Sequence, residues 1–536
     1  MTTVPVHNVS PTIADLLKFL EQVPSESNSQ AGREQHPPFF LSQVSDQAGV
    51  IYEKLRSAVD NKEEHFLRRH AIRRIARRAM WFSEDPESIT TLLLRELYRC
   101  GYLPANSVSR EAEDRVMKTV KGFLLLSASV GAHVDMAEFL RLRSTLLDIV
   151  AGAIEDDLYH TYNEEVLVRT LARVTALSLD APRYDGLSPD TKQTFIYLAA
   201  WRALFGADNA LLVYKLWLLR YPQWEEMSEE EKDGLGKAFV PFVTESSVLL
   251  GHSFAKRLVP RMHNNAVAMT VIYDLVKRYG FGVGATMNNR DEFRARIREV
   301  IMAIYRSDIA RASRRAWRAV LYIFTTKVLL ALITESLFLS FWHGTLNYIA
   351  IGVNIIFHPL LLLLLTSWIV APPKKNTERL ITIIDTIVYG GELPATSVQP
   401  ASSGIMNDVA LAAYIVTLSA MLVNLAWWLD EFGFHVIDIV FFIAFLALVL
   451  YFGFRVRHAA RRMELQGGRE GFFQSLIELA ALPFVSVGRW LVTKFEKLNI
   501  IAIFLDFFVE VPLKLIFHFF DSFSNVLHEK KEEMYS

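Results

Sequence analysis

The chain has 536 residues, of which 51% are hydrophobic and 21% are charged, and its net charge is −1. This length exceeds what one hydrophobic core organises, so we expect two or more domains. The modest numbers of Gly and Pro, 25 and 19, exclude a fibrous protein. The single cysteine, Cys100, excludes an intramolecular disulfide and fits a reducing compartment.

The first 42 residues are expected to form a short helix and a polar linker. Ser10 and Pro11 match an N-cap followed by Pro at the first helical position. Residues 24–38 (PSESNSQAGREQHPP) are polar and bounded by prolines, which is typical of a flexible linker.

Residues 43–310 are expected to form a cytoplasmic helical domain. Helical spacing of apolar residues recurs there, and strand alternation is nearly absent. Ser188, which is followed by Pro, opens a helix that Gly206 ends, and Ser228 begins a capping box. The predicted fold class is therefore all-α. In it, a large soluble helical domain precedes a four-helix transmembrane bundle and a C-terminal amphipathic region.

Four apolar segments within residues 319–454 are long enough to cross a membrane. A hydrocarbon core of about 30 Å requires roughly 20 helical residues. The predicted spans are residues 320–341, 348–370, 409–429 and 434–454. Between the second and third spans, residues 377–391 (TERLITIIDTIVYGG) are amphipathic and are expected to lie at the membrane interface.

Basic residues flank these spans on one side only, because the two tight turns between paired spans contain no Lys or Arg. The positive-inside rule therefore places both termini in the cytoplasm, with the spans in a cell or inner membrane. Basic residues at a membrane surface bind anionic lipid headgroups with up to about 1 kcal/mol each. The residues expected to do so are Arg306, Arg311, Arg314, Arg315 and Arg318 before the first span, Lys374 and Lys375 in the middle loop, and Arg455, Arg457, Arg461 and Arg462 after the fourth.

Residues 455–536 are expected to form a cytoplasmic or interfacial helical tail. Within it, residues 498–523 are apolar except for a stripe of ionisable residues spaced three or four apart. Such a helix lies in the headgroup plane or crosses as a fifth span. We favour the in-plane arrangement, because an Asp or Lys at mid-depth in lipid costs about 2.5–3.5 kcal/mol. Pro512 also favours a bent, peripheral helix.

Several polar residues fall inside the predicted spans. Glu335, His358 and Asp438 lie toward the outer half of three different spans, and Asn354 shares a helix face with His358. One hypothesis is a site that handles protons or cations, since carboxylate and imidazole suit both tasks. The other is interhelical hydrogen bonding that fixes helix packing. We favour the second, because no spacing motif supports the first.

The soluble region contains no HExxH, GxxxxGK[ST], GxSxG or paired CxxC motif, so we predict no catalytic site, metal or cofactor. Residues 63–81 (EEHFLRRHAIRRIARRAMW) are rich in arginine, which suits anionic lipid or nucleic acid. However, the arginines spread around the helix circumference. We therefore favour a solvated helix, or one paired with acidic neighbours such as residues 225–233, and we expect no nucleic acid partner.

These observations leave three classes of function. The favoured one is a cytoplasmic interaction or regulatory module, anchored by the spans and bound to an unknown cytoplasmic protein. The second is a transporter or channel that uses the polar residues of the spans. Four spans without an internal repeat are few for a transporter, so it would require a homo-oligomer. The third, a membrane-embedded enzyme, has no motif in its favour.

Overall fold

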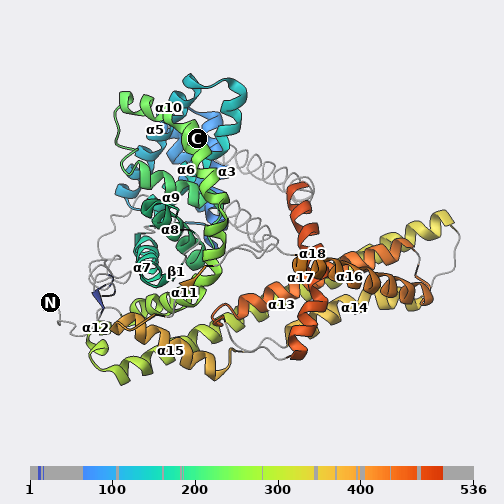
Figure 1. Cartoon of the computed structure of the whole chain (residues 1–536). Helices are drawn as coiled ribbons and strands as arrows, with labels where there is room; N and C mark the ends of the chain where they lie inside the picture. Colours follow the sequence, from blue (N-terminus) through green and yellow to red (C-terminus); the bar gives the residue numbers. More distant parts are fainter. Residues whose placement is uncertain are drawn as a thin grey trace, which may run out of the picture. The chain divides into compact units, whose positions relative to one another are not determined.

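Among the described residues, nearly all secondary structure is α-helical, as the sequence predicts (Figure 1). The computed structural model describes residues 10–11, 13, 16, 64–103, 108–159, 162–180, 184, 186–279, 282–342, 348–367, 371–393, 396–398, 405–434, 436–466 and 472–498. Side chains of residues 325–342 and 348–351 are outside the description.

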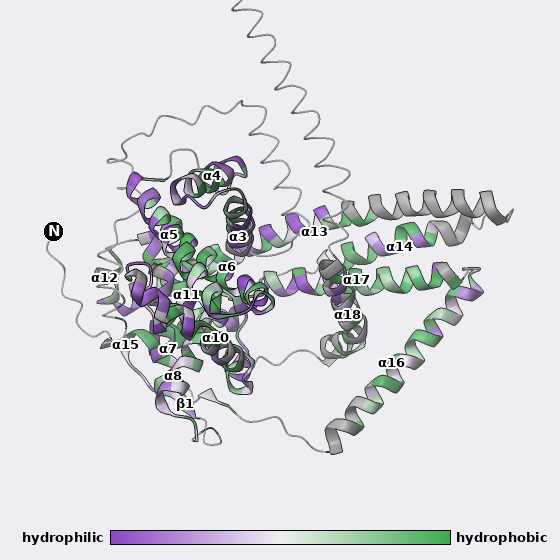
Figure 2. Ribbon diagram, turned by 90° about the horizontal axis from the view of Figure 1, so that it is seen from above, coloured by the Kyte–Doolittle hydropathy of each residue, from purple (hydrophilic) through white to green (hydrophobic). Residues whose placement is uncertain are grey.

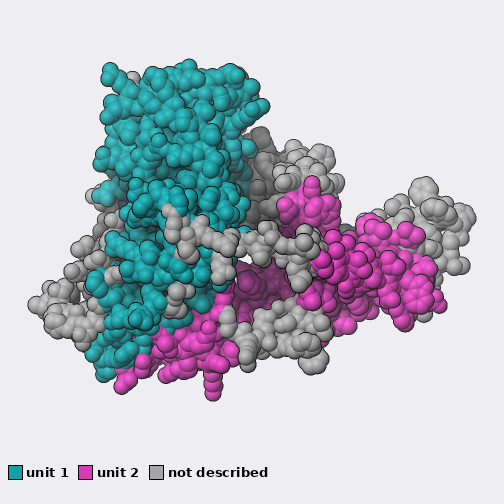
Figure 3. All heavy atoms as spheres, viewed as in Figure 1, with its two compact units in different colours: residues 1–290, 383–399, 516–536 teal, residues 291–382, 400–515 magenta. Residues whose placement is uncertain are grey.

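The chain divides into two units (Figure 3). Unit 1 contains the described parts of residues 1–290 and 383–399. Unit 2 contains those of residues 291–382 and 400–515. The first division along the chain falls at the start of a long helix.

Unit 1 is built from ten described helices and two very short strands. The helices are α3 (Glu64–Phe82), α4 (Pro86–Arg99), α5 (Arg110–His133), α6 (Met136–Tyr159), α7 (Tyr162–Ser178), α8 (Pro189–Phe205), α9 (Asn209–Arg220), α10 (Glu229–Gly251), α11 (Ser253–Tyr279) and α12 (Gly282–Met287). Strands β1 (Leu179–Asp180) and β2 (Thr396–Ser397) pair in parallel.

The predicted helix boundaries of α8 and α10 are confirmed. The Ser188 side chain accepts a hydrogen bond from the first turn of α8, and Gly206 ends that helix with a φ of 61°. This left-handed conformation favours glycine. Ser228 and Glu231 form the predicted capping box at the start of α10. Each of these signals is local, so the sequence alone is sufficient to find it.

The core of unit 1 is rich in aromatic side chains. Trp201, Trp217 and Trp224 are almost fully buried, and the Trp217 ring packs against Phe239 and Phe242 of α10 at centroid distances of 5.6 and 5.0 Å. Large aromatic residues bury much apolar area at small conformational cost. This cluster joins α9 to α10 and the turn between them.

Only Ser10, Pro11, Ile13 and Leu16 of the predicted N-terminal helix and linker are described. The Ser10 N–H donates to the carbonyl of Val388 at 2.7 Å, and its hydroxyl donates to the carbonyl of Ile387 at 2.8 Å. Ile13 and Leu16 are buried. This segment therefore packs within unit 1 rather than projecting from it.

Unit 2 contains α13 (Arg290–Trp342), α14 (Tyr348–Ser367), the first half of α15 (Lys374–Tyr389), α16 (Ile405–Glu431), α17 (Val436–Ala460) and α18 (Phe472–Leu498). Helix α13 has 53 residues, which at 1.5 Å per residue is about 80 Å. The charged residues before the first predicted span therefore belong to the same helix as the span.

Small residues bring the helices of unit 2 together around α17. Ala312 and Ala316 of α13 pack against Val456 and Ala460. Helix α18 approaches so closely that a Cβ added at Gly488 would lie 2.2 Å from the carbonyl oxygen of Ala447. Close backbone approach through small residues is typical of packed apolar helices.

Two helical stretches are long and apolar enough to cross a membrane, Ala412–Glu431 and Asp438–Ala460, and Gly352–Ser367 is a shorter apolar stretch. Only 6% of the apolar window of α16 is buried. Helix α16 meets α17 near their shared turn, through Leu429, Phe434 and Phe442, and Leu422 also packs against the cluster that contains Leu446. The earlier part of α16 diverges from α17 (Figure 2). A four-helix bundle is therefore not confirmed.

The prediction that residues 377–391 lie at a membrane interface is wrong for most of the segment. They form the greater part of α15, and Leu380, Ile384 and Val388 on its apolar face are fully buried in protein. An amphipathic stripe has the same sequence pattern whether protein or lipid covers it. Residues 499–523, which hold nearly all of the possible fifth span, lie outside the described residues.

Candidate functional site

His358 is the predicted polar residue that the structure places most clearly. It is fully buried between α14 and α17, and its Nε2 lies 3.0 Å from the carbonyl oxygen of Phe442. Its Nδ1 lies 3.3 Å from the carbonyl oxygen of Asn354, one turn earlier on α14. The rings of Phe442 and Phe445 pack against it at centroid distances of 4.6 and 6.0 Å.

This arrangement constrains the chemistry of His358. Both carbonyl groups are acceptors, so a neutral imidazole donates to one of them and a protonated imidazolium donates to both. The ring therefore holds at least one proton at the interface of two apolar helices. The contact between His358 and the carbonyl of Phe442 is also an interhelical hydrogen bond of the kind that our second hypothesis predicts.

The other three predicted residues are placed less closely together. Asp438 lies in the first turn of α17, one turn before Phe442, and is half-buried. Asn354 is half-buried and meets the His358 ring through its backbone carbonyl. Glu335 lies on α13, but its side chain is outside the described residues. The structure thus joins His358 to α17.

The basic residues predicted to contact lipid headgroups fall into two groups. Most are exposed: Arg306, Arg314, Arg315 and Arg318 on α13, Lys374 and Lys375 at the start of α15, and Arg455 near the end of α17. The Trp317 side chain lies among them on α13 and is 62% exposed. An exposed Trp beside arginines is typical of a membrane–water interface.

Arg311 and Arg462 are also exposed, but both bind a buried partner inside unit 2. Arg311 and Arg462 both form ion pairs with the buried carboxylate of Asp308, with a distance of 2.8 Å from Arg462 Nε to Asp308 Oδ2. Arg461 pairs with Glu464 at 3.0 Å, and Arg457 is half-buried. Asp308 therefore links the basic end of α17 to α13.

Asn376 completes this polar junction and was not predicted. Its Nδ2 donates to the Tyr305 hydroxyl at 2.9 Å and to the carbonyl of Met463 at 3.0 Å, and its Oδ1 accepts from the N–H of Leu465 at 2.8 Å. Three segments that the sequence placed on one side of the membrane are thus tied together by side-chain hydrogen bonds. Asn376 gave no sequence signal, whereas Asp308 lies three residues before Arg311 and could have been identified as its counter-ion.

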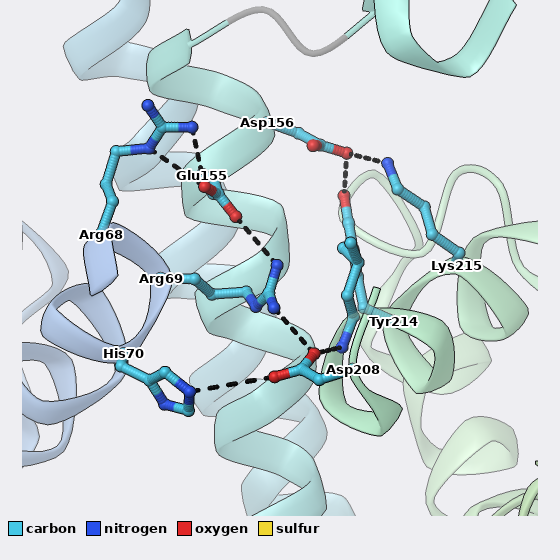
Figure 4. A network of polar contacts seen from close by, with 9 residues as sticks. Arg68, Arg69, His70, Glu155, Asp156, Asp208, Tyr214 and Lys215 are labelled. Carbon is cyan, nitrogen blue, oxygen red and sulfur yellow. Dashed lines mark hydrogen bonds and ion pairs between the residues drawn. The ribbon is translucent and has the colours of Figure 1, made fainter. Parts of the chain in front are cut away.

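In unit 1, the arginine-rich helix α3 is held by a buried ion-pair network (Figure 4). Arg69 is almost fully buried and lies 3.4 Å from Glu155 of α6 and 2.7 Å from Asp208. Asp208 also accepts from the N–H of Leu211 and so caps α9. Arg68 pairs with Glu155 at 2.9 Å and stacks on the Tyr159 ring.

The prediction of a salt-bridged helix is thus confirmed for part of α3, although the partners come from elsewhere. They are carboxylates of α4, α6 and the start of α9, not residues 225–233. The spacing of arginines around the helix reflects several neighbours on different sides. A buried ion pair adds little net stability, because desolvation offsets the attraction, but removal of one partner is strongly destabilising.

Further carboxylates lie next to this network. Asp156 accepts from the Tyr214 hydroxyl at 2.8 Å and from Lys215 Nζ at 2.9 Å. Burial raises the pKa of Asp157 to about 6 and the pKa of Glu225 to about 7. Among the described residues, no group of three or more His, Cys, Asp or Glu side chains is arranged to hold a metal ion.

The sequence matches no protein-family description, no curated protein and no solved structure.

Proposed function

We propose that the chain is a multi-pass membrane protein that anchors a helical cytoplasmic interaction module. The proposal depends on the apolar surface of α16. Only 6% of the apolar window of this helix is buried inside the protein. Val416 and Val423, for example, are 68% and 69% exposed. Contiguous exposed apolar surface of this extent marks an interaction or membrane surface.

The ends of the apolar helices support a membrane as the covering medium. Trp427, Trp428 and Phe432 are exposed near the turn between α16 and α17. At the opposite end of α17, the apolar run stops before Arg455, so Val436–Phe454 covers about 28 Å of helix. This length fits a hydrocarbon core of about 30 Å, with aromatic residues at one interface and arginines at the other.

The predicted spans have basic residues on one side only, and this charge asymmetry supports four spans. Two of them are α16 and α17, and the apolar end of α13 and α14 would supply the other two. Both termini would then be cytoplasmic, and the exposed arginines of α13 would contact anionic headgroups. The exposed apolar surface of α16 would also suit contact with a second copy of the chain in a homo-oligomer.

An interaction role for unit 1 is supported by large apolar side chains on its surface. Trp81, Met136 and Leu177 are each more than 70% exposed. Trp and Met are enriched at protein–protein interfaces relative to the rest of the surface. A cytoplasmic protein is therefore the proposed partner.

Cysteine labelling of intact cells tests the topology. In a Cys100→Ser background, we would place one cysteine at Asp430 in the α16–α17 turn and, in a separate variant, one at Lys374. A membrane-impermeant maleimide is expected to label the first in intact cells and the second only after permeabilisation. Labelling of the Lys374 position from outside, or recovery of the chain in the aqueous fraction without detergent, would overturn the proposal.

Transport is the second candidate function, and the observation in its favour is the full burial of the His358 imidazole, an ionisable group, between the apolar helices α14 and α17. Proton or cation flux into proteoliposomes separates the two candidates. Flux in the wild type that is lost in His358→Gln or Glu335→Gln would favour transport. Absence of flux in the wild type would leave the anchoring function alone.

A further inference from the structure

A cavity of about 530 Å³ lies within unit 1. Five helices contribute to its wall, through Thr145 of α6, Arg202 of α8, Asn209 of α9, Ser246 of α10 and Lys256 of α11. Cavities of this size are in the range that holds small-molecule ligands. Its wall combines residues far apart in the sequence, so it exists only in the folded domain.

The charge of the cavity is positive. Arg202 and Lys256 line it, and none of the residues that line it carries a carboxylate. The Arg202 guanidinium donates to the neutral amide oxygen of Asn209 at 2.9 Å. This sets Arg202 apart from Arg69, whose charge is balanced by two carboxylates.

The helix that carries Lys256 does not stabilise its charge. Lys256 is the fourth residue of α11, and the N-terminal turn of a helix has a positive potential that disfavours cations. Arg202, in contrast, is in the last turn of α8, where the helix potential favours it. Partial burial nevertheless lowers the pKa of Arg202. An anion in the cavity would offset both the unfavourable helix potential at Lys256 and the desolvation of Arg202.

The rest of the wall suits an organic molecule with hydrogen-bonding oxygens. Val213, Val243 and Leu250 give an apolar side to the cavity, and Thr145 and Ser246, which carry hydroxyl groups, also line it. Phosphate carries close to two negative charges at neutral pH and has three acceptor oxygens. A guanidinium group matches phosphate geometry through paired N–H donors.

We propose that this cavity binds a phosphate monoester, with the phosphate between Arg202 and Lys256 and the organic group against Val213, Val243 and Leu250. The cavity is larger than phosphate alone requires, so the apolar wall selects for the ester. The phosphate monoester can be a soluble molecule or a lipid headgroup, and the two sources share this chemistry.

Binding to the full chain in neutral-lipid nanodiscs tests the proposal. By calorimetry, we expect phenyl phosphate to bind more tightly than inorganic phosphate or benzoate. Arg202→Gln and Lys256→Gln are each expected to weaken phenyl phosphate binding about tenfold, because each removes a charge-assisted contact. Lys121→Gln is the matched control, since this exposed residue of α5 does not line the cavity, and its affinity should equal that of the wild type.

A short-chain phosphatidate separates the two sources. Tighter binding of phosphatidate than of phenyl phosphate assigns the site to a lipid headgroup, and the reverse assigns it to a soluble ester. Lys256 is exposed, so Lys256→Gln should fold normally, with its circular dichroism as the check. No binding of any phosphate probe to the wild type, equal binding of benzoate, or unchanged affinity in both cavity variants would overturn the proposal.

Discussion

The carboxylate of Asp157 should make unit 1 less stable at high pH than at low pH. Its Oδ2 accepts from the Thr119 hydroxyl at 2.6 Å, yet burial raises its pKa from 3.8 to about 6. Arg115 and Lys118 partly oppose this rise, whereas the neighbouring carboxylate of Asp156 adds to it. Replacing Asp157 with Asn keeps the acceptor for Thr119 and removes the charge.

The direction and size of the effect follow from proton linkage. A carboxylate with a raised pKa in the folded state holds its proton more tightly when folded, so its contribution is fully present below about pH 4 and is lost as pH rises through about 6. The difference between 3.8 and about 6 corresponds to about 3 kcal/mol. Asp157→Asn should therefore match the wild type near pH 4 and be up to about 3 kcal/mol more stable near pH 8.

Denaturant unfolding of the full chain in detergent measures this difference. The signal is the fluorescence of Trp217 and Trp224 in a variant in which the other eight tryptophans are replaced by Phe. Wild type and variant would be compared at several pH values between 4 and 8. Glu226→Gln is the control, because Glu226 is exposed, pairs with Lys118 at 2.7 Å and has a lowered pKa. If Asp157→Asn lowers stability equally at every pH, Asp157 acts only as a hydrogen-bond acceptor and our reasoning is wrong.

Two further substitutions test the packing of each unit. Arg69→Met should lower the free energy of unfolding of unit 1 by about 3 kcal/mol, because it leaves the buried Glu155 with one fewer positive partner. A loss below about 1 kcal/mol in the same fluorescence assay would contradict this. Gly488→Ala should increase hydrogen exchange in α18, because its Cβ would meet the carbonyl of Ala447 at 2.2 Å. Gly352→Ala is the control, since nothing lies within 4 Å of its added Cβ, and equal exchange in both variants would refute the close approach.

The features of the fold that the sequence predicts correctly depend on short stretches of chain. The Ser188 cap, the left-handed Gly206 and the capping box at Ser228 each need only a few neighbouring residues. The apolar runs of α16 and α17 are equally local, and two of the four predicted spans coincide with helices long enough to cross a membrane.

Features that depend on packing were missed or misread. The apolar stripe of α15 predicts a face that avoids water, but it cannot distinguish protein from lipid as the covering material. In the candidate sites, Arg69 and Asp208 are 139 residues apart, and Asn376 is 71 residues from Tyr305. No spacing rule connects such residues, because the fold rather than the local helix brings them together.

The basic flanks show how such packing changes the interpretation of a sequence signal. The positive-inside rule counts Arg311 and Arg462, but both bind the buried carboxylate of Asp308. Their charges are therefore partly neutralised before they meet a headgroup. The charge asymmetry persists without them, because Arg314, Arg315 and Arg318 are exposed beside the apolar end of α13 and no Lys or Arg occupies residues 430–434. The predicted orientation therefore depends on Arg314, Arg315 and Arg318, while Asp308 uses Arg311 and Arg462 to hold α13 to the segment that follows α17.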